Sequence, residues 1–177
     1  MKHLLITIAA VVLVGCGPSV PDISINKAAE DGNIEAVKQH LAAGTDVNSK
    51  ALDLREDRRI FNGNSPLFFS STKEVAEMLI ANGAKINITY NGFIPSHFSA
   101  HEGHIEVTDL FIRKEANLNS LEIDGLTPLD FTNQPNNDVP TRFELKPELL
   151  DQNRIVTADL LRKHGGNRGT ELKAKGK

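Results

Sequence analysis

The chain has 177 residues, a length that suits one domain, with 20 lysines and arginines against 23 aspartates and glutamates and a formal net charge of −3 at pH 7. This slight acidic excess argues against a nucleic-acid-binding protein, which usually shows a basic surplus. Because Cys16 is the single cysteine, a disulfide within the chain and a metal site built from several cysteines are both excluded.

Residues 1–15 have the layout of a secretory leader. Lys2 gives a basic start, the run from Leu4 to Val14 is apolar, and small residues precede Cys16. The apolar run has 11 residues, whereas a helix that crosses a bilayer takes about 20. The alternative to a cleaved leader is an N-terminal anchor that stays in place.

The four residues Leu13-Val14-Gly15-Cys16 resemble the bacterial lipoprotein box. The resemblance implies removal of residues 1–15, lipidation of Cys16, and attachment to a membrane of the bacterial cell envelope. Gly17 stands where inner-membrane lipoproteins of enteric bacteria carry Asp, which favours the outer membrane facing the periplasm. Residues 16–22 then form a lipidated tether, in which the six residues after Cys16 reach about 20 Å at most.

Two motifs recur in the rest of the chain. The first surrounds three prolines, in NSPLFFSS (Pro66), FIPSHFSA (Pro95) and LTPLDFTN (Pro128). The second is an ending, in HLAAGTDVN (40–48), LIANGAKIN (79–87) and FIRKEANLN (111–119). Together they resemble ankyrin repeats, at about 23–48, 64–87, 91–119 and 124–166. The resemblance implies an all-α solenoid of about four helix-turn-helix repeats with hairpin fingers, over residues 23–168.

Each copy can also be interpreted from its local chemistry. Ser65 and Thr127 are good helix N-caps, and the proline after each suits the first helical position. A short inner helix is followed by an outer helix with apolar residues at helical spacing. Gly44 and Gly83 provide the left-handed residue that ends this outer helix. A single copy cannot cover its own apolar face, so the copies must stack.

The second and third copies depart from this pattern. The second is three residues short between Pro66 and Gly83, which predicts an abbreviated turn between its helices. The third has Ile94 where a capping Thr belongs and Glu115 where the Gly belongs. We therefore expect the helix ends of the third copy to be less well satisfied.

The fourth copy carries an insertion at about 133–154, and Pro147 is placed to open a longer outer helix that runs to His164. The basic tail, residues 169–177, is expected to form a frayed or short capping helix. The alternative is that its lysines contact anionic lipid headgroups.

SHFSAHEGHIEV (96–107) places His97, His101 and His104 at i, i+4 and i+7, beside Glu102. On one unbroken helix these rings would share a face and suggest a metal site. However, Gly103 is expected to end the inner helix, and HEGH is not the HExxH spacing of zinc proteases. The ankyrin resemblance implies structural roles for His97 and His104. We therefore expect no metal, while His101 remains a candidate for partner contact.

Partner-binding residues are expected on the hairpins and the inner-helix face, as the resemblance implies. The hairpin between the first two copies is about ten residues longer than the others and carries LDLREDRRIFNGN. Long loops tend to be functional, although a merely solvated loop is the alternative. The candidates are Arg55, Glu56, Asp57, Arg58, Arg59, Phe61, Tyr90 and His101.

Phe69, Phe98 and Phe131 each lie three residues after the proline of their copy. Residues at one register position stack along a solenoid, so we interpret them as an aromatic ladder in the core between repeats. If this ladder is partly open, it would offer a hydrophobic anchor to a partner.

No nucleophile–base pair or glycine-rich phosphate loop is recognisable in the sequence. The expected function is therefore that of a monomeric, membrane-anchored module, without catalysis or cofactor, that binds an unidentified protein partner. One alternative is a metal-binding or enzymatic envelope protein that uses His97, His101 and His104. Another is a purely structural envelope component.

Overall fold

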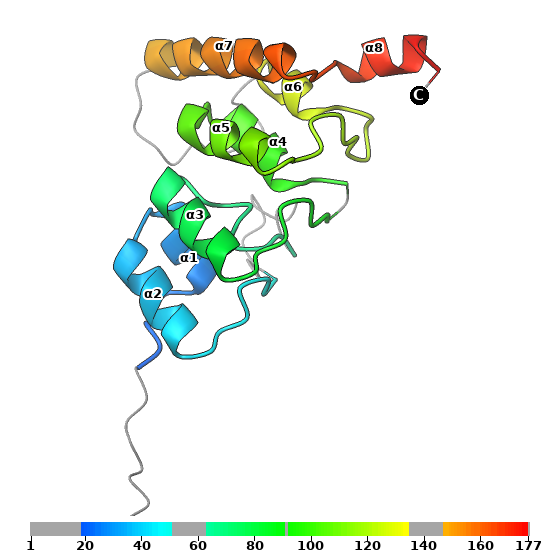
Figure 1. Ribbon diagram of the computed structural model, residues 1–177. Coiled ribbons are helices and arrows are strands. Elements are labelled where there is room, and N and C mark those ends of the chain that lie inside the picture. The colour runs from blue at the N-terminus through cyan, green and yellow to red at the C-terminus, as the bar shows by residue number, and fades with distance from the viewer. Residues whose placement is uncertain (1–18, 51–62, 91, 135–146, 177) are drawn as a thin grey trace, which may run out of the picture.

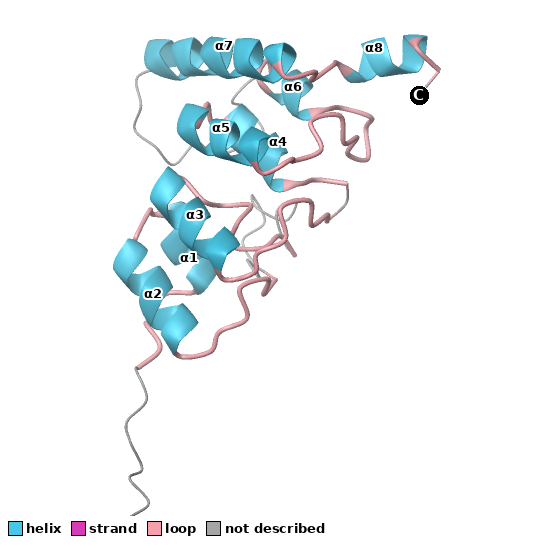
Figure 2. Ribbon diagram, in the orientation of Figure 1, coloured by secondary structure: helices cyan, strands magenta, loops and turns pink. Residues whose placement is uncertain are grey.

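The computed structural model of this protein describes residues 19–50, 63–90, 92–134 and 147–176. Within these ranges the chain forms eight helices and no strand (Figure 2). The helices are α1 (Ile25–Glu30), α2 (Ile34–Ala42), α3 (Lys73–Ala81), α4 (Pro95–His101), α5 (Ile105–Arg113), α6 (Pro128–Phe131), α7 (Pro147–Lys163) and α8 (Gly169–Ala174). The predicted all-α class is confirmed.

The helices stack in chain order, with α1 and α2 near one end and α7 and α8 at the other (Figure 1). Three copies contain an inner and an outer helix: α1 with α2, α4 with α5, and α6 with α7. The outer helices form one continuous row, because α2 packs on α3, α3 on α5, and α5 on α7. The inner helix α4 packs on α6. This serial packing is the solenoid predicted from the repeats.

The second copy has consecutive turns in place of an inner helix. The N–H groups of Phe68 and Phe69 donate to carbonyls three residues back, at 3.0 and 3.1 Å. Residues 70–72 then connect to α3, a stretch as long as residues 102–104 of the third copy. The three missing residues therefore come from the inner helix, and the prediction of an abbreviated turn is wrong. The reason is that the Ser71 N–H and hydroxyl both donate to the Ala29 carbonyl, at 3.3 Å each, which fixes the turn against α1.

Glu115 ends α5 as a glycine would. It has a φ of 60°, and its N–H donates to the Ile112 carbonyl at 3.0 Å. The next N–H, of Ala116, donates to the Phe111 carbonyl at 3.0 Å, as in a Schellman motif. The expectation of poorly satisfied bonds at this helix end is therefore wrong. The cost lies instead in the left-handed conformation of a residue with a side chain.

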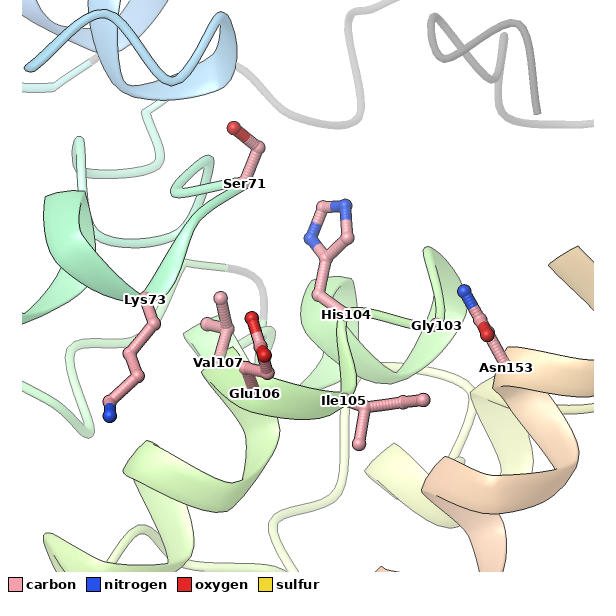
Figure 3. A pocket seen from close by; sticks show the side chains of 8 residues that line it. All are labelled: Ser71, Lys73, Gly103, His104, Ile105, Glu106, Val107 and Asn153. Atoms are coloured by element: carbon pink, nitrogen blue, oxygen red, sulfur yellow. The ribbon is translucent and has the colours of Figure 1, made fainter.

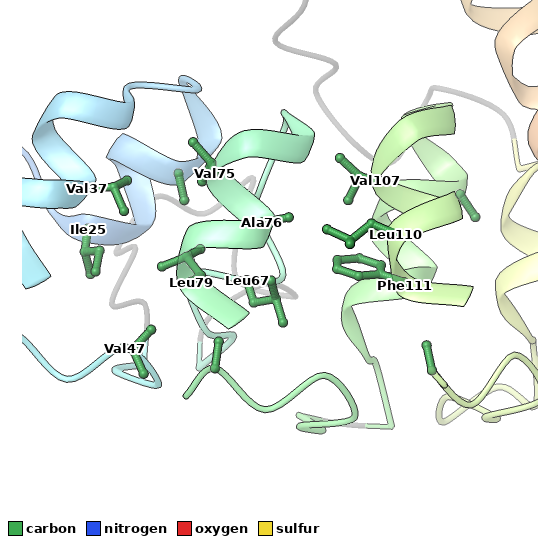
Figure 4. Packing of buried hydrophobic residues seen from close by; sticks show 14 of the residues in the cluster. Ile25, Val37, Val47, Leu67, Val75, Ala76, Leu79, Val107, Leu110 and Phe111 are labelled. Carbon is green, nitrogen blue, oxygen red and sulfur yellow. The ribbon is translucent and has the colours of Figure 1, made fainter. Parts of the chain in front are cut away.

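The copies share one buried aliphatic core that passes between the stacked helices (Figure 4). Its fully buried members come from every copy and include Val37, Leu67, Val75, Leu79, Val107, Phe111, Leu129 and Leu161. Each copy supplies only a few of these side chains, so the core exists only because the copies stack.

The aromatic ladder is largely core. Phe69 and Phe98 are 6 % and 7 % exposed, and their ring centroids lie 5.8 Å apart in an edge-on arrangement. For these two residues the interpretation as core between repeats is confirmed. Phe131 is half-buried and packs against Phe93 and His97, at centroid distances of 5.6 and 5.2 Å.

Asparagines at the ends of two copies bond to the copy that follows. Asn48 accepts the Lys85 N–H at 2.9 Å and donates to the Gly83 carbonyl at 3.1 Å. Asn119 accepts the Asn167 N–H at 2.8 Å in the same way. Because each amide uses both its donor and its acceptor across the boundary, it fixes the spacing of neighbouring hairpins.

The outer helix and the tail of the fourth copy agree with their predictions, while residues 135–146 of the predicted insertion lie outside the described residues. The outer helix α7 begins at Pro147 and ends at Lys163, one residue before the predicted end. The tail forms the short helix α8, and Leu172 within it is 6 % exposed. Over the part of the chain that the structure covers, no helix is long and apolar enough to cross a membrane.

Candidate interaction surface

The three histidines of the central copy belong to different local structures. The inner helix α4 ends at His101, Gly103 takes a φ of 65°, and His104 is the N-cap residue of α5. The predicted helix break thus lies between His101 and His104, so the three rings do not share one helix face. Among the described residues, no group of three or more His, Cys, Asp or Glu side chains is placed to hold a metal ion.

His97 has the structural role that the sequence predicted. Its Nδ1 accepts the Ile94 N–H at 3.1 Å, and its Nε2 lies 3.3 Å from the Leu126 carbonyl oxygen in the next hairpin. The ring thus caps the start of α4, where Ile94 cannot, and bridges two copies. Complete burial lowers the pKa of His97 to about 4. Burial also lowers the pKa of His104.

His101 is not available to a partner, which corrects the sequence-based expectation. Its side chain is 2 % exposed, and its Nδ1 lies 3.0 Å from a carboxylate oxygen of Glu102. Nη2 of Arg154, from α7, lies 3.2 Å from the ring Nε2 and 3.3 Å from Nδ1. A partner would have to displace this arginine to reach the imidazole.

Arg154 fastens the long outer helix to the inner layer. It is 5 % exposed, and its Nε donates to the His101 carbonyl oxygen while its Nη1 donates to that of Gln134 at 3.0 Å. Burial lowers the pKa of Arg154, although the nearby carboxylates of Glu102 and Asp151 oppose this shift. The guanidinium of Arg154 therefore has a structural role, because every described contact that it makes lies inside the protein.

The inner face of the third copy is closed. All seven residues of α4 are buried, so this helix presents no open side chain to a partner. The resemblance had implied that both the inner-helix face and the hairpins contact partners. Because the face of α4 is closed, the hairpins remain as the surface of this copy that can contact a partner.

An open hollow of about 360 Å³ lies between the second and third copies (Figure 3). Its walls include Ser71, Lys73, His104 and Glu106, and it lies beside the shortened inner segment of the second copy. The Lys73 ammonium is already 3.6 Å from the Glu77 carboxylate. Glu106 occupies the first turn of α5, where its charge complements the helix dipole and would repel an anion. We interpret the hollow as a gap left by the short repeat.

The hairpin before α6, in contrast, presents an apolar tip. In the hairpin before α6, Gly125 N–H donates to the Glu122 carbonyl at 2.9 Å. The buried Glu122 carboxylate accepts the N–H groups of Asp124 and Leu126, both at 3.0 Å. This tight turn leaves Ile123 outside, with 80 % of its surface exposed.

Tyr90 occupies the equivalent place in the preceding hairpin. It is half-buried and forms a two-way backbone bridge with Phe93, at 3.1 and 2.9 Å. Both Tyr90 and Ile123 lie five residues before the proline of their copy, and so does Phe61. Phe61 lies outside the described residues, so we call Tyr90 and Ile123 the finger column.

Neighbouring hairpins touch through glycines. A Cβ on Gly63, which has a φ of 90°, would lie 2.5 Å from the Tyr90 ring. A Cβ on Gly92, with a φ of 81°, would lie 2.6 Å from the Glu122 Cα. Only glycine fits both the conformation and the space. The hairpins therefore form one continuous edge of the stack.

The short helix α8 closes this edge. The Asp130 carboxylate accepts the Gly169 N–H at 2.8 Å and lies 3.4 Å from an Arg168 nitrogen. Partial burial acts to raise the pKa of Asp130, but these contacts and those with Thr127 outweigh it and hold the pKa below its ordinary value. A Cβ on Gly125 would lie 3.2 Å from the Lys173 Nζ, so this lysine lies beside the hairpin that carries Ile123.

The predicted site residues divide into three groups. Outside the described residues lie the lipidation site Cys16 and the long-hairpin candidates Arg55, Glu56, Asp57, Arg58, Arg59 and Phe61. Tyr90 is on a hairpin as expected, and His101 is buried. The sequence analysis missed Ile123, although its distance from Pro128 equals that of Tyr90 from Pro95.

Comparison with known protein families agrees with this architecture. A family model described as Ankyrin repeats (3 copies) matches residues 25–122. The matched range begins with α1, includes the outer helix α5, and ends in the hairpin that carries Ile123. Ankyrin repeats mediate binding to protein partners. From the serial packing of the helices and this match, we conclude that the chain belongs to the ankyrin-repeat family.

Proposed function

We propose that this protein is a lipid-anchored adaptor of the bacterial cell envelope that binds a protein partner through its hairpin edge and performs no catalysis. The observation that carries the proposal is the contrast between two surfaces of the third copy. The inner helix α4 is entirely buried, whereas Ile123 on the following hairpin is 80 % exposed. Leu121, two residues earlier, is 38 % exposed as well, and apolar side chains that gather in solvent are typical of an interaction site, whereas scattered single ones are not.

The rigidity of the edge supports the same conclusion. The contacts of Tyr90 with Gly63 and of Glu122 with Gly92 hold the hairpins against one another. Because the finger column is already ordered, docking requires little loss of conformational entropy, so more of the contact energy appears as affinity.

The anchoring part of the proposal rests on the leader and Cys16. Residues 19–24 precede α1 at one end of the stack (Figure 1), so a lipid on Cys16 would leave the hairpins free along its side. The test is metabolic labelling with radioactive palmitate, followed by membrane fractionation. We expect label in the wild-type chain and none in Cys16→Ala, which should also leave the membrane fraction. A wild-type chain that carries no palmitate label would contradict the proposed lipid anchor.

The binding part can be tested by affinity capture from an envelope extract with residues 17–177, which contain every described helix. The finger variant is Tyr90→Ser with Ile123→Ser. The matched control is Ile155→Ser, because Ile155 is 56 % exposed on the outer helix α7. We expect a protein that is retained by the wild type and the control but lost with the finger variant. A capture pattern that the finger variant leaves unchanged would favour a purely structural role.

A further inference from the structure

At the α8 end of the hairpin edge, two lysines have no carboxylate partner among the described residues. Lys173 and Lys175 are both exposed. The Lys175 Nζ donates to the neutral side-chain oxygen of Asn167 at 2.7 Å. In the part of the chain that the structure describes, Lys173 has no ion-pair partner.

The acids nearest to α8 are already engaged within the protein. Asp130 accepts the Gly169 N–H and pairs with Arg168, and Glu171 accepts the Arg168 N–H at 2.9 Å. Asp124, next to Ile123, is the exposed acid of the neighbouring hairpin. At the α8 end of this edge, the two lysines are therefore the described cations that can meet an external carboxylate.

We infer that the finger column binds an extended protein segment with apolar side chains at every third position and carboxylates at the end that lies on α8. This inference rests on the proposed function and specifies the chemistry of its partner. The apolar side chains would cover Tyr90 and Ile123, and the carboxylates would pair with Lys173 and Lys175. The charged end fixes the direction in which the segment lies along the edge.

The spacing follows from helix packing. Stacked helices lie about 8–10 Å apart, and successive hairpins share that repeat. A segment in the polyproline II conformation rises about 3.1 Å per residue with three residues per turn, so it advances about 9 Å between side chains on the same side. An apolar residue at every third position therefore meets one hairpin after another.

The probes are fluorescein-labelled peptides of three Pro-Pro-Leu units, followed by three glutamates or by three lysines. Their binding to residues 17–177 is measured by fluorescence anisotropy at low salt. We expect the glutamate peptide to bind about tenfold more tightly than the lysine peptide, since exposed ion pairs contribute modestly. Lys173→Glu with Lys175→Glu should reverse the preference. Lys38→Glu with Lys114→Glu, on α2 and at the C-cap of α5, should leave it unchanged.

Equal binding of the two peptides, or a preference that survives in the Lys173→Glu, Lys175→Glu variant, would overturn the inference. So would lysine-dependent binding to phosphatidylglycerol vesicles without discrimination between the peptides, because α8 would then face lipid. A captured protein that is lost with the finger variant but is insensitive to the two lysine substitutions would overturn the inference and leave the proposed function intact. If the finger variant captured the same proteins as the wild type, the proposed function itself would be refuted.

Discussion

His97 should make the stability of this protein fall in mild acid. The ring is completely buried, and its pKa of about 4 lies below the ordinary value of 6.5. Between these two pH values the unfolded chain binds a proton that the folded chain does not. The free energy of unfolding therefore decreases as the pH falls from 6.5 to 4, and this group adds no pH dependence above that window.

The size of the effect follows from the two pKa values. Relative to pH 7, His97 should remove about 2 kcal/mol of stability at pH 5 and about 3 kcal/mol at pH 4. The main cause is that burial removes the charged ring from water. In addition, a protonated Nδ1 cannot accept the Ile94 N–H, which lies 3.1 Å away at the start of α4. The folded state thus loses a capping bond when the buried ring gains a charge.

Urea unfolding of residues 17–177, followed by far-UV circular dichroism at pH 7, 6, 5 and 4, measures this effect. The comparison is with His97→Asn, whose amide oxygen can still accept the Ile94 N–H but does not titrate. We expect the wild type to lose about 3 kcal/mol more than the variant between pH 7 and pH 4. Other groups, including His104, titrate in both proteins and cancel. If the wild type and the variant lost the same stability between pH 7 and pH 4, the conclusion that His97 is buried and neutral would be refuted.

Three further predictions concern the packing. Glu115→Gly should raise the free energy of unfolding in urea by about 1 kcal/mol, because glycine adopts the left-handed conformation without the steric cost that a side chain brings. Gly83→Ala should lower the free energy of unfolding by a similar amount for the same reason. Two changes of the same sign would contradict this reasoning. Arg154→Met should lower the free energy of unfolding by about 2 kcal/mol, because the buried carbonyl of His101 and the part-buried carbonyl of Gln134 lose their donor. The matched change Arg162→Met, at an exposed residue, should have little effect, and equal effects of the two changes would show that Arg154 does not fasten α7. Asp130→Asn should speed amide hydrogen exchange in α8, and exchange as slow as in the wild type would show that other contacts hold this helix.

The elements that could be predicted from the sequence are those whose ends are fixed locally. Thr127 and Asp130 bond to each other across one turn, and Pro128 begins α6 as the first helical residue. Pro147 opens α7 for the same reason. Such signals act over three or four residues, so a single sequence contains them completely.

The features that could not be predicted depend on contacts between distant segments. The turn of the second copy is held by the Ala29 carbonyl, 42 residues before Ser71. His101 is covered by Arg154, 53 residues later in the chain. No periodicity in the sequence reports either contact, because each pairs residues from different repeats. For this reason the sequence predicted a shortened turn where the structure has a shortened inner helix, and it predicted an accessible His101 where the structure buries it.

Ile123 shows how a departure from local stability rules points to function. Burying a side chain of this size typically stabilises a protein by about 1.5–3 kcal/mol, yet here it is left 80 % exposed. The turn that exposes it uses the buried carboxylate of Glu122, a group whose desolvation is unfavourable unless hydrogen bonds compensate. The exposed Ile123 contributes none of this stability, and the two N–H bonds to Glu122 serve to compensate the burial of its charge. A polar residue at position 123 and an ordinary Asn-Gly turn would remove both features. Because they coincide at one hairpin tip, on an edge that Tyr90 and its glycine contact hold in register, contact with a partner explains them better than the folding of the chain alone.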